Sequence, residues 1–361
     1  MRTLDADDAH NAVVGGGFFA AGGGGWEHHG ELMGSLAVSV GQPSLTTADE
    51  LSPDTWVATV TAIGAPAAKT WEIQPLDYVR ALQRLIDAVD VPIGAVMTAQ
   101  NGYSTTLNGW IQSAVLGIPV LDAAGDVRAH PTGKLGSMGL TTREGYQAIQ
   151  SVAGGNRALH GYFEAVVRGS VVTCDDVLRD ISVRTGGFIA AARNPLELSW
   201  VRKHAALGSI SLALDLGARM RAATDGGPDA VIESVCEFTG AVVLASGPIS
   251  HGEPLRTQGG WDHGSFVVDG NEISYLNEFL AVTAAGERRA TYPDTIALIS
   301  RDTRRALAVK DVVEGMPVAV LAAPAAGLPL STSACDVVAL REVEQITGVE
   351  LVRYLPEEFR R

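Results

Sequence analysis

GGGFFAAGGGGWEHHG, residues 15–30, carries the densest structural signal in this chain. The four consecutive glycines Gly22–Gly25 supply no side chains to a core, and they cost backbone entropy unless a positive φ or a close approach requires them. The next segment, Glu27–Val40, has apolar residues at helical spacing: Leu32, Leu36, Ala37 and Val40. We therefore expect the glycines to lead into the N-terminus of a helix, where free backbone amides form a natural anion site.

Two interpretations of the glycine run stay open: a ligand-binding loop, or a flexible connector between two helices. The residues before it have a helical pattern, with Val14 and Phe18 four apart on one face. A dinucleotide-binding loop follows a strand, and a P-loop carries a lysine that GGGGWEHHG lacks. The run is therefore neither of these nucleotide loops. Whether His28 and His29 contact a ligand or cap the helix is also open.

The composition limits the classes of protein that this chain can form. A length of 361 residues predicts two domains, and 46% apolar with 19% charged residues predicts a compact globular protein. The net charge of −14 argues against nucleic acid and anionic membranes as partners. There is no apolar run of about 18 residues that would span a bilayer. The acidic start MRTLDADDAHN does not resemble a signal peptide. We expect a cytoplasmic homo-oligomer that acts on a small molecule.

The number and spacing of the cysteines also fit a cytoplasmic protein. Cys174, Cys236 and Cys335 are widely spaced and form no CxxC pair, so neither a zinc knuckle nor a disulfide framework is expected. Cys174 precedes Asp175 and Asp176, whose charges raise the pKa of a thiol. It is therefore a poor candidate for a nucleophile.

The first half of the chain alternates between strand and helix patterns. Strand patterns cover 56–63, 91–100 and 118–121, and helix patterns open near Pro75 and run from Trp110 to Leu116. This alternation predicts an α/β domain with a mixed or parallel sheet flanked by helices. Ligands bind at the carboxyl ends of such strands. The three strand ends are Gly64–Pro66, Gln100–Ser104 and Asp122–His130.

The pattern changes after about residue 165. Residues 171–190 are typical of a strand–helix passage, and 195–223 of one long helix. From Val231 onward the pattern predicts strands, with a two-residue turn at Asp269-Gly270. We therefore predict an N-terminal α/β domain over 1–165, to which later segments can return, and a helical connection with a β-rich C-terminal domain over 166–361.

Polar residues at the strand ends are the candidates for chemistry. Gln100, Asn101 and Ser104 supply neutral donors and acceptors, which suit an amide- or imide-like ring better than a phosphate. Gly64 lies at another strand end, and Gly23, Gly24 and Gly25 offer backbone amides to the same ligand.

The loop LDAAGDVRAHPTGK holds the acid–base candidates. Asp122 and His130 are candidates for proton transfer, and Arg128 for binding a substrate carboxylate. Alternative roles are a helix cap or turn for Asp122 and an exposed arginine for Arg128; Asp126 is typical of a turn.

A metal site has no local motif in this sequence. Neither HxH nor HExxH occurs, and His160, His204, His251 and His263 are scattered. One mononuclear site, such as a zinc site, stays open as a combination of distant residues: His28, Asp122 and His130. No GxSxG motif is present, so a serine hydrolase with that nucleophile elbow is not expected.

Several short motifs occur in an order that resembles the S-methyl thiohydantoin desulfurase-like family of bacteria. In the first half they are FFAAGGGGW, AIGAP, GAVMTAQNGYSTTLNG and LGIPVLDAAGDVRAHPTGK. In the second half they are GSISLALDLG, YLNEFLAV, YPDTIALIS and EGMPVAVLAAP. The resemblance covers about residues 3–325, and it rests on the order of the motifs more than on any single one.

The resemblance implies hydrolysis at a five-membered thiohydantoin-type ring, in which water attacks a ring carbon and a thiol leaves. In that chemistry Gln100 and Asn101 would contact ring groups, Asp122 would orient or deprotonate water, and the amides of Gly22–Gly25 would stabilise a developing anion. The chain departs from the family where Gln100 or Asn101 replaces a glutamate and where PTGK replaces an acid. These departures imply a divergent member. The competing hypothesis is a non-catalytic binding or accessory protein that has lost the acids.

Overall fold

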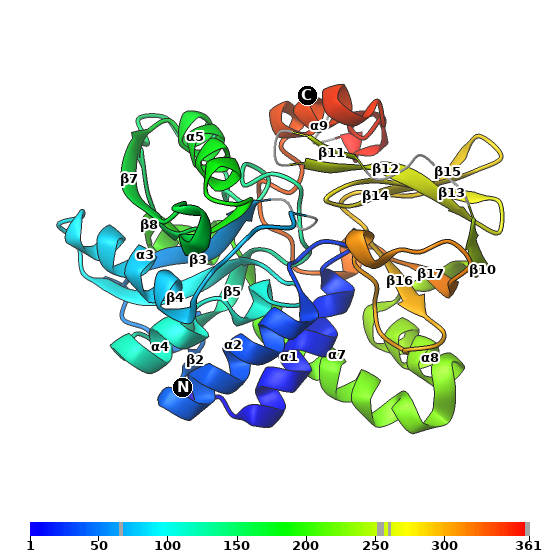
Figure 1. The fold of residues 1–361 in the computed structure, drawn as a ribbon, viewed down its shortest axis with the longest axis horizontal. Helices are drawn as coiled ribbons and strands as arrows, with labels where there is room; N and C mark the ends of the chain where they lie inside the picture. Colours follow the sequence, from blue (N-terminus) through cyan, green and yellow to red (C-terminus); the bar gives the residue numbers. More distant parts are fainter. Residues whose placement is uncertain (65–67, 251–255, 259–260, 358–361) are drawn as a thin grey trace.

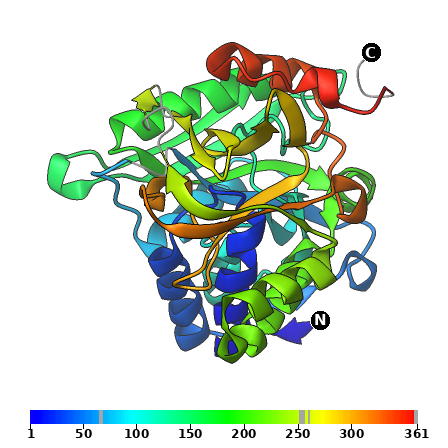
Figure 2. The ribbon, with the colours of Figure 1, turned by 90° about the vertical axis from the view of Figure 1, so that its right-hand side faces the viewer.

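The computed structural model describes residues 1–64, 68–250, 256–258 and 261–357. It has two sheets side by side, a mixed sheet flanked by helices and an antiparallel sheet that curls on itself (Figure 1). Figure 2 shows the antiparallel sheet from its own side, with helices above and below it. The predicted fold class, an α/β N-terminal part and a β-rich C-terminal part, is therefore confirmed.

The first sheet has the strand order β1-β2-β5-β4-β3-β8-β6-β7, and β9 (Ala206–Leu207) pairs with β5. Strands β2, β5, β4 and β3 are parallel neighbours, whereas β8 runs antiparallel between β3 and β6. The bounds are β1 Arg2–Thr3, β2 Ser44–Thr46, β3 Trp56–Gly64, β4 Ile93–Gln100, β5 Val120–Asp126, β6 Ala148–Gly154, β7 Phe163–Gly169 and β8 Phe188–Glu197.

Helices bury both faces of this sheet. Alternate residues of β3 show the two faces: Ala58 and Val60 pack with the helices before residue 120, and Val57 packs with the later helices. This explains why the strands have nearly continuous apolar sequences. One face carries α1 (Ala6–Phe19), α2 (Glu27–Val40), α3 (Pro75–Asp87) and α4 (Trp110–Leu116); the other carries α5 (Val171–Arg184) and α6 (Leu198–His204).

The second sheet has the order β15-β14-β13-β12-β10-β17-β16, with β11 paired to β12. Its strands are β10 Val242–Ser250, β11 Arg256–Gln258, β12 Trp261–Val268, β13 Asn271–Leu276, β14 Glu278–Ala284, β15 Glu287–Thr291, β16 Thr295–Ser300 and β17 Pro317–Ala323. The predicted turn at Asp269-Gly270 is confirmed, because both residues have positive φ and Val268 pairs with Asn271. Helices α7 (Ser209–Ala223), α8 (Gly227–Thr239) and α9 (Val337–Thr347) pack around it.

Three predictions about the second half are wrong. The expected helix over 195–223 is interrupted, because β8 continues to Glu197 and α7 begins only after Gly208, whose φ is 76°. The expected strand from Val231 is part of α8, which buries Val231, Ile232 and Val235 on one face and ends at Gly240. The passage over 171–190 has the reverse order, helix α5 before strand β8.

The strand predicted to end at Asp122 is also longer than expected. β5 continues to Asp126, because β4 pairs with it as far as Gln100↔Asp126 and β9 pairs with it on the other side. β7 runs across residue 165, and β8 and β9 return to the first sheet. The domain boundary at residue 165 stays a prediction.

The glycine run follows α1 and precedes α2, as predicted, and the structure places it between the two sheets. Its backbone carbonyls and that of Ala21 accept hydrogen bonds from three segments. Phe279 N donates to Ala21 O (2.6 Å), Val309 N to Gly22 O (2.7 Å) and Ser104 N to Gly24 O (3.1 Å). These hydrogen bonds fix the glycine run between the two sheets, so it is not the flexible connector of the alternative interpretation.

None of the described helices combines the length and the hydropathy that a crossing of the bilayer requires.

Candidate functional site

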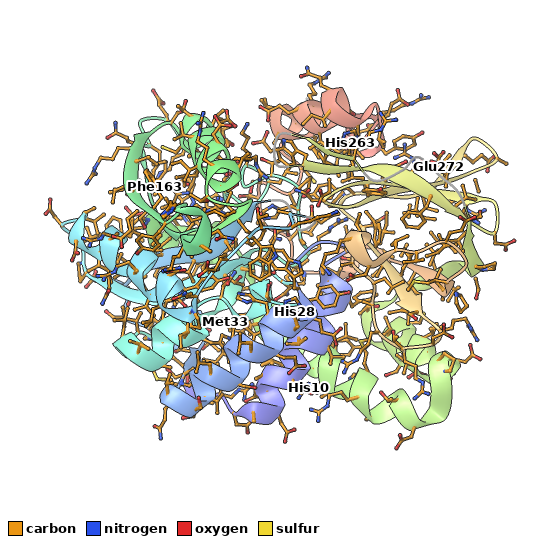
Figure 3. The ribbon with its side chains drawn as sticks, viewed as in Figure 1. His10, His28, Met33, Phe163, His263 and Glu272 are labelled. Atoms are coloured by element: carbon orange, nitrogen blue, oxygen red, sulfur yellow. The ribbon has the colours of Figure 1, made fainter. Side chains whose placement is uncertain are left out.

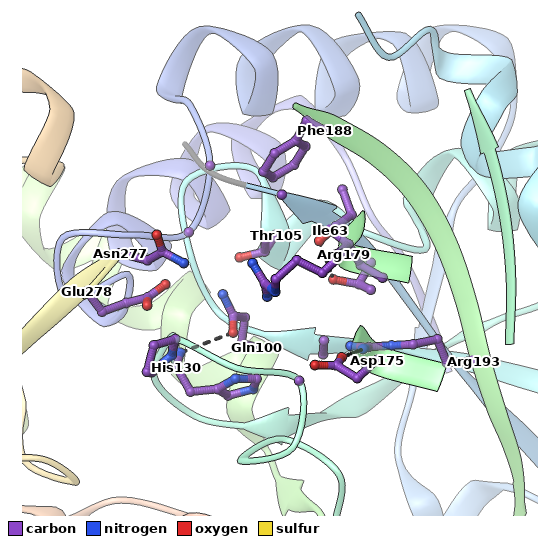
Figure 4. A pocket seen from close by; sticks show the side chains of 18 residues that line it. Ile63, Gln100, Thr105, His130, Asp175, Arg179, Phe188, Arg193, Asn277 and Glu278 are labelled. Carbon is purple, nitrogen blue, oxygen red and sulfur yellow. Dashed lines mark hydrogen bonds and ion pairs between the residues drawn. The ribbon is translucent and has the colours of Figure 1, made fainter. Parts of the chain in front are cut away.

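A small pocket lies where the carboxyl ends of β3 and β4 meet the turn between β13 and β14 (Figure 4). Water-sized molecules can place their centres in about 60 Å³ of it, which is room for a small polar ligand and not for a nucleotide. Its lining comes from both sheets: Gly24, Gly25, Thr61, Ala62, Ile63, Gly64, Ala99, Gln100, Thr105, His130, Pro131, Gly133, Asp175, Arg179, Phe188, Arg193, Asn277 and Glu278.

The structure brings together five of the residues that the sequence predicts for the site. They come from four separate segments, because β3, β4 and β5 are neighbours whose ends share one edge of the sheet. Ala65 and Pro66, predicted at the end of β3, lie outside the described residues, as does His251. The five lining residues are Gly24, Gly25, Gly64, Gln100 and His130.

Gln100 connects the end of β4 to the loop after β5. Its Oε1 accepts a hydrogen bond from the backbone amide of His130 (3.1 Å), which fixes the side chain. The amide nitrogen of Gln100 points into the pocket in Figure 4. This group is therefore placed to donate to a carbonyl of a ligand.

His130 is buried in the pocket wall and is uncharged at neutral pH. Burial, assisted by the charge of Arg193, lowers its pKa to about 3, although the nearby backbone of Ala99 and Thr132 opposes this shift. Neither ring nitrogen meets hydrogen-bond geometry with any described residue. One ring nitrogen of a neutral imidazole is an acceptor, so His130 has the chemistry to take a proton from a water that reaches its buried ring.

Glu278 faces the pocket from the second sheet. Glu278 is 3% exposed. Burial raises the pKa of its carboxyl to about 8, although the charges of Arg128 and Arg179 have smaller effects that lower this pKa. Its Oε2 has no hydrogen-bond partner among the described residues. At pH 7 most of this carboxyl is protonated, so Glu278 can donate a proton inside the pocket.

The glycine run approaches this carboxyl closely. A Cβ on Gly23 would lie 2.1 Å from Glu278 Oε1, so only glycine leaves room for the carboxyl there. Gly24 and Gly25 have φ values of 72° and 87°, which glycine adopts without strain. Their amides donate to no acceptor in the described part of the chain and precede the N-terminus of α2. They are thus available to an anion.

Two arginines and an aspartate form the far wall. Arg193 Nη1 lies 3.2 Å from Asp175 Oδ1, and both side chains are buried. The Arg179 guanidinium stacks on the Trp261 ring, 3.9 Å from its centroid. Burial lowers the pKa of both arginines, which nevertheless stay charged.

Asp122 lies away from the pocket lining and caps a helix. Its Oδ1 accepts from the backbone amides of Ile210 and Ser211 (both 3.0 Å), and its Oδ2 accepts from Ser211 Oγ (2.5 Å). The first turn of α7 therefore uses both carboxylate oxygens. This contradicts the expectation that Asp122 ends a strand facing a ligand; its catalytic role has no support from this geometry and stays an untested prediction.

Arg128 also lies elsewhere: it is fully buried between the two sheets and is not the exposed residue of the alternative interpretation. Its guanidinium donates to the backbone oxygens of Ala129 (2.9 Å), Asp294 (2.6 Å) and Phe279 (3.0 Å), and it lies over the Tyr292 ring. These bonds occupy it with protein groups, so a role in binding a substrate carboxylate stays a prediction without geometric support.

Asn101 and Ser104 are buried behind the lining. Asn101 Nδ2 donates to Ser209 O (2.9 Å) and its Oδ1 accepts from Thr106, so its amide faces away from the ligand space. Ser104 lies against the glycine run, where a Cβ on Gly25 would be 2.0 Å from its Oγ. Of the three neutral polar residues predicted after β4, only Gln100 lines the pocket.

The histidines after the glycine run do not line the pocket either. His29 is buried, with its Nε2 3.2 Å from Tyr78 Oη, and burial lowers its pKa to about 4. His28 is exposed on α2 (Figure 3). No group of three His, Cys, Asp or Glu side chains within the described ranges could hold a metal ion, so the combination of His28, Asp122 and His130 is not assembled.

Sequence reasoning missed Asp175, Arg179, Arg193, Asn277 and Glu278. Arg193 gives one usable signal, since it is the lone cation within the apolar strand FIAAARNPLE. Asp175 was noted only for its effect on the Cys174 thiol, whose pKa is indeed raised, by burial first and then by Asp175. Asn277 joins β13 to β14, and Glu278 is the first residue of β14. Nothing local in the sequence marks these two residues as facing the other sheet.

Two family models match the chain, and its fold resembles that of a solved structure. The models described as S-Me-THD-like, N-terminal domain and S-Me-THD-like, C-terminal domain match residues 7–159 and 169–342. The crystal structure of a protein from Chromobacterium violaceum matches with a TM-score of 0.71 and 19% identity, over 96% of each chain. At that identity the likeness shows the fold alone. No curated protein matches significantly.

Proposed function

The chain belongs to the S-Me-THD-like family, and we propose that it hydrolyses a small thiohydantoin-type ring or a related cyclic amide or imide. Water attacks a ring carbon, and a thiol or an amine leaves. The family match supports the thiohydantoin-related class, and the reaction itself is our proposal.

The observation that carries this proposal is a pair of buried proton-carrying side chains in one pocket. His130 is neutral, and Glu278 is mostly protonated at pH 7. Among the described residues, neither the ring nitrogens of His130 nor the Oε2 of Glu278 have a partner that meets hydrogen-bond geometry. Buried polar atoms without partners are uncommon in folded proteins and often mark catalytic or binding roles. Two groups with pKa values shifted in opposite directions are typical of acid and base assignments.

The proposed steps balance with one water molecule. His130 takes a proton from the water as its oxygen bonds to the ring carbon that bears sulfur. The carbon–sulfur bond then breaks and Glu278 gives its proton to the departing thiolate. The proton that remains on the attacking oxygen passes to the ring nitrogen, and the proton on His130 returns to the Glu278 carboxylate through bound water. A ring carbonyl and a thiol are the products.

The other lining groups hold the ring. The Gln100 amide is placed to donate to a ring carbonyl, because its oxygen is already bonded to His130 N. The amides of Gly24 and Gly25 are placed to stabilise the charge that develops on the ring, in the manner of an oxyanion hole. A cytoplasmic location, a homo-oligomeric state and a metal cofactor stay predictions.

The test is turnover of a synthetic S-methyl thiohydantoin by the purified protein, followed by methanethiol release with a thiol reagent and by hydantoin formation. We expect both products in equal amounts. His130→Asn should lower kcat/KM by about 100-fold or more, as expected for loss of a proton-transfer group. His204→Asn is the matched control, because His204 bonds to Thr332 and does not line the pocket.

Binding without turnover is the outcome that favours the competing hypothesis. A thermal shift with hydantoins or thiohydantoins, in a protein that releases no thiol, would indicate a binding or accessory protein. No thermal shift and no turnover with any of these rings would overturn the proposed substrate class.

A further inference from the structure

Asn277 lines the pocket from the second sheet, and the reaction steps given above do not use it. It joins β13 to β14 with a φ of 56°, in the left-handed region, which asparagine adopts more readily than most residues. Two hydrogen bonds to Asp262 fix this residue. Asn277 N donates to Asp262 O (2.6 Å), and Asn277 Oδ1 accepts from Asp262 N (2.8 Å). The side chain is buried, so it is held in this orientation.

The bond to Asp262 determines which end of the Asn277 amide faces the pocket. The partner is a backbone N–H, which needs an acceptor, so Oδ1 must lie against it and Nδ2 must point away. Figure 4 shows this nitrogen directed into the pocket. Nδ2 donates to none of the residues that the structure describes. The second sheet therefore offers the pocket one neutral N–H donor.

Gln100 has the same arrangement on the wall that the first sheet forms. Its Oε1 also accepts from a backbone amide, that of His130 (3.1 Å), and its Nε2 also points into the pocket (Figure 4). Within the described ranges Nε2 has no acceptor either. Gln100 and Asn277 together form a two-donor site, with one carboxamide from the end of β4 and one from the turn before β14.

This pair of donors selects for a particular kind of ring. A buried donor without an acceptor is unfavourable, and a ligand acceptor removes that cost. Two donors on different walls match a ligand whose two acceptors lie on different edges. A five-membered imide-type ring meets this condition, because a carbonyl lies on each side of one ring nitrogen. A ring with a single carbonyl leaves one donor unpaired.

We propose that the two-donor site binds both acceptor edges of the substrate ring: Gln100 Nε2 donates to the ring carbonyl, and Asn277 Nδ2 donates to the oxygen that the attacked carbon gains. The inference rests on the proposed function, because it assigns the donors for the same ring. The edges follow from the order of the chain. Glu278, which gives its proton to the leaving thiol, comes directly after Asn277, so Asn277 lies nearest the attacked carbon.

The test is calorimetric binding of hydantoin, which has two ring carbonyls, and of ethylene urea, a five-membered ring with one. We expect hydantoin to bind about 2- to 10-fold more tightly, as for one added neutral hydrogen bond. Asn277→Asp keeps an acceptor for Asp262 N and replaces the donor nitrogen by an oxygen, so it should remove this preference. The affinity for ethylene urea should change less than about threefold, because Gln100 still binds its carbonyl.

Asn277→Gly is the second variant, because glycine also adopts this φ and adds no charge. It should remove the preference as well, which assigns the loss to the missing donor and not to the new charge. Asn156→Asp is the matched control. Asn156 Oδ1 also accepts from a backbone amide, that of Leu159 (3.1 Å), but Asn156 does not line the pocket. This control should keep the preference of the wild type.

Equal affinity of the wild-type protein for the two rings would overturn the inference, as would an unchanged preference in either Asn277 variant. Release of methanethiol from S-methyl thiohydantoin separates the inference from the proposed function. Turnover by a protein that binds the two rings equally keeps the reaction and overturns the two-donor site. A preference for hydantoin that depends on Asn277, without thiol release, keeps the two-donor site and overturns the reaction.

Discussion

The two sides of the pocket are built in different ways. The glycine side takes its shape from backbone and neutral groups in the first 130 residues: Gly24, Gly25, Gly64, Gln100 and His130. The charged side takes its ionisable groups from later segments: Asp175, Arg179, Arg193 and Glu278. Local sequence marks the glycine side, because glycine runs and strand ends are short-range patterns. The charged side depends on which distant segments become neighbours, and no short pattern marks it.

Glu278→Gln tests the charged side and has the largest expected effect. The substitution keeps the shape of the side chain and removes its proton, so kcat/KM should fall about 100- to 10,000-fold. The variant should be more stable than the wild type at pH 7 and about equally stable below pH 4.5, because glutamine does not have to take up the proton that the Glu278 carboxyl binds on folding. Glu272→Gln is the control, on an exposed residue of β13 (Figure 3). Full turnover in Glu278→Gln would remove Glu278 from the mechanism.

Arg128→Met tests what holds the two sides together. It removes the hydrogen bonds to the backbone oxygens of Phe279 in β14 and of Asp294 just before β16. We expect a loss of about 3 kcal/mol in the free energy of unfolding, measured by denaturant titration. Substrate affinity per folded molecule should stay near the wild-type value. A selective loss of affinity with unchanged stability would restore Arg128 as a ligand-binding residue.

Gly23→Ala tests the contact between the sides. Its Cβ would meet Glu278 Oε1 at 2.1 Å, so the carboxyl must move. We expect kcat/KM to fall about 10- to 100-fold, as for a small misplacement of a catalytic group. Gly327→Ala is the control, because a Cβ there meets nothing within 4 Å. If Gly23→Ala keeps full activity, the exact position of the Glu278 carboxyl does not matter.

The pH dependence tests Glu278 as the proton donor. Its pKa is raised to about 8, so kcat/KM should fall about tenfold between pH 7 and pH 9. Between 4.5, the ordinary value, and about 8 the folded state holds one more proton than the unfolded state, so stability should fall as pH rises through that window. Both dependences should be absent in Glu278→Gln. An alkaline limb that persists there belongs to another group.

Asp122→Asn has the smallest expected effect. Asparagine still accepts from the amides of Ile210 and Ser211 but loses the second anionic oxygen, so we expect about 1 kcal/mol of destabilisation. Turnover per folded molecule should change less than about twofold, since the residue does not line the pocket. Abolished turnover with normal stability would instead establish Asp122 as catalytic.

The part of the fold that the sequence predicts correctly consists of segments with strong hydrophobic periodicity or with a clear turn signal. Helix α2 has the predicted bounds Glu27–Val40, and the Asp269-Gly270 hairpin lies where its turn signal indicated. The failures arise from tertiary pairing. The last residues of β8, from Pro195, were predicted to start a helix, but Leu196 and Glu197 pair with β3. The part of α8 from Val231 was predicted to be a strand, but it buries one helical face.

Only part of the candidate site could be predicted from the sequence. Gln100 and His130 follow strand ends, and parallel strands deliver their ends to one edge. Asp122 and Arg128 lie in the same segment, but backbone groups of α7 and of the second sheet occupy them. Chemical type alone therefore did not separate ligand-binding residues from structural ones, because the difference depends on long-range hydrogen bonds.

The place of β8 in the first sheet has a consequence for synthesis on the ribosome. β6 and β7 are complete by residue 169, but β8, which joins them to β3, ends only at Glu197. Until then the nascent chain has two sheet fragments, each with an unpaired edge that can pair with another chain. A chain stopped at residue 169 keeps both edges, so we expect such a fragment to aggregate when it is expressed alone.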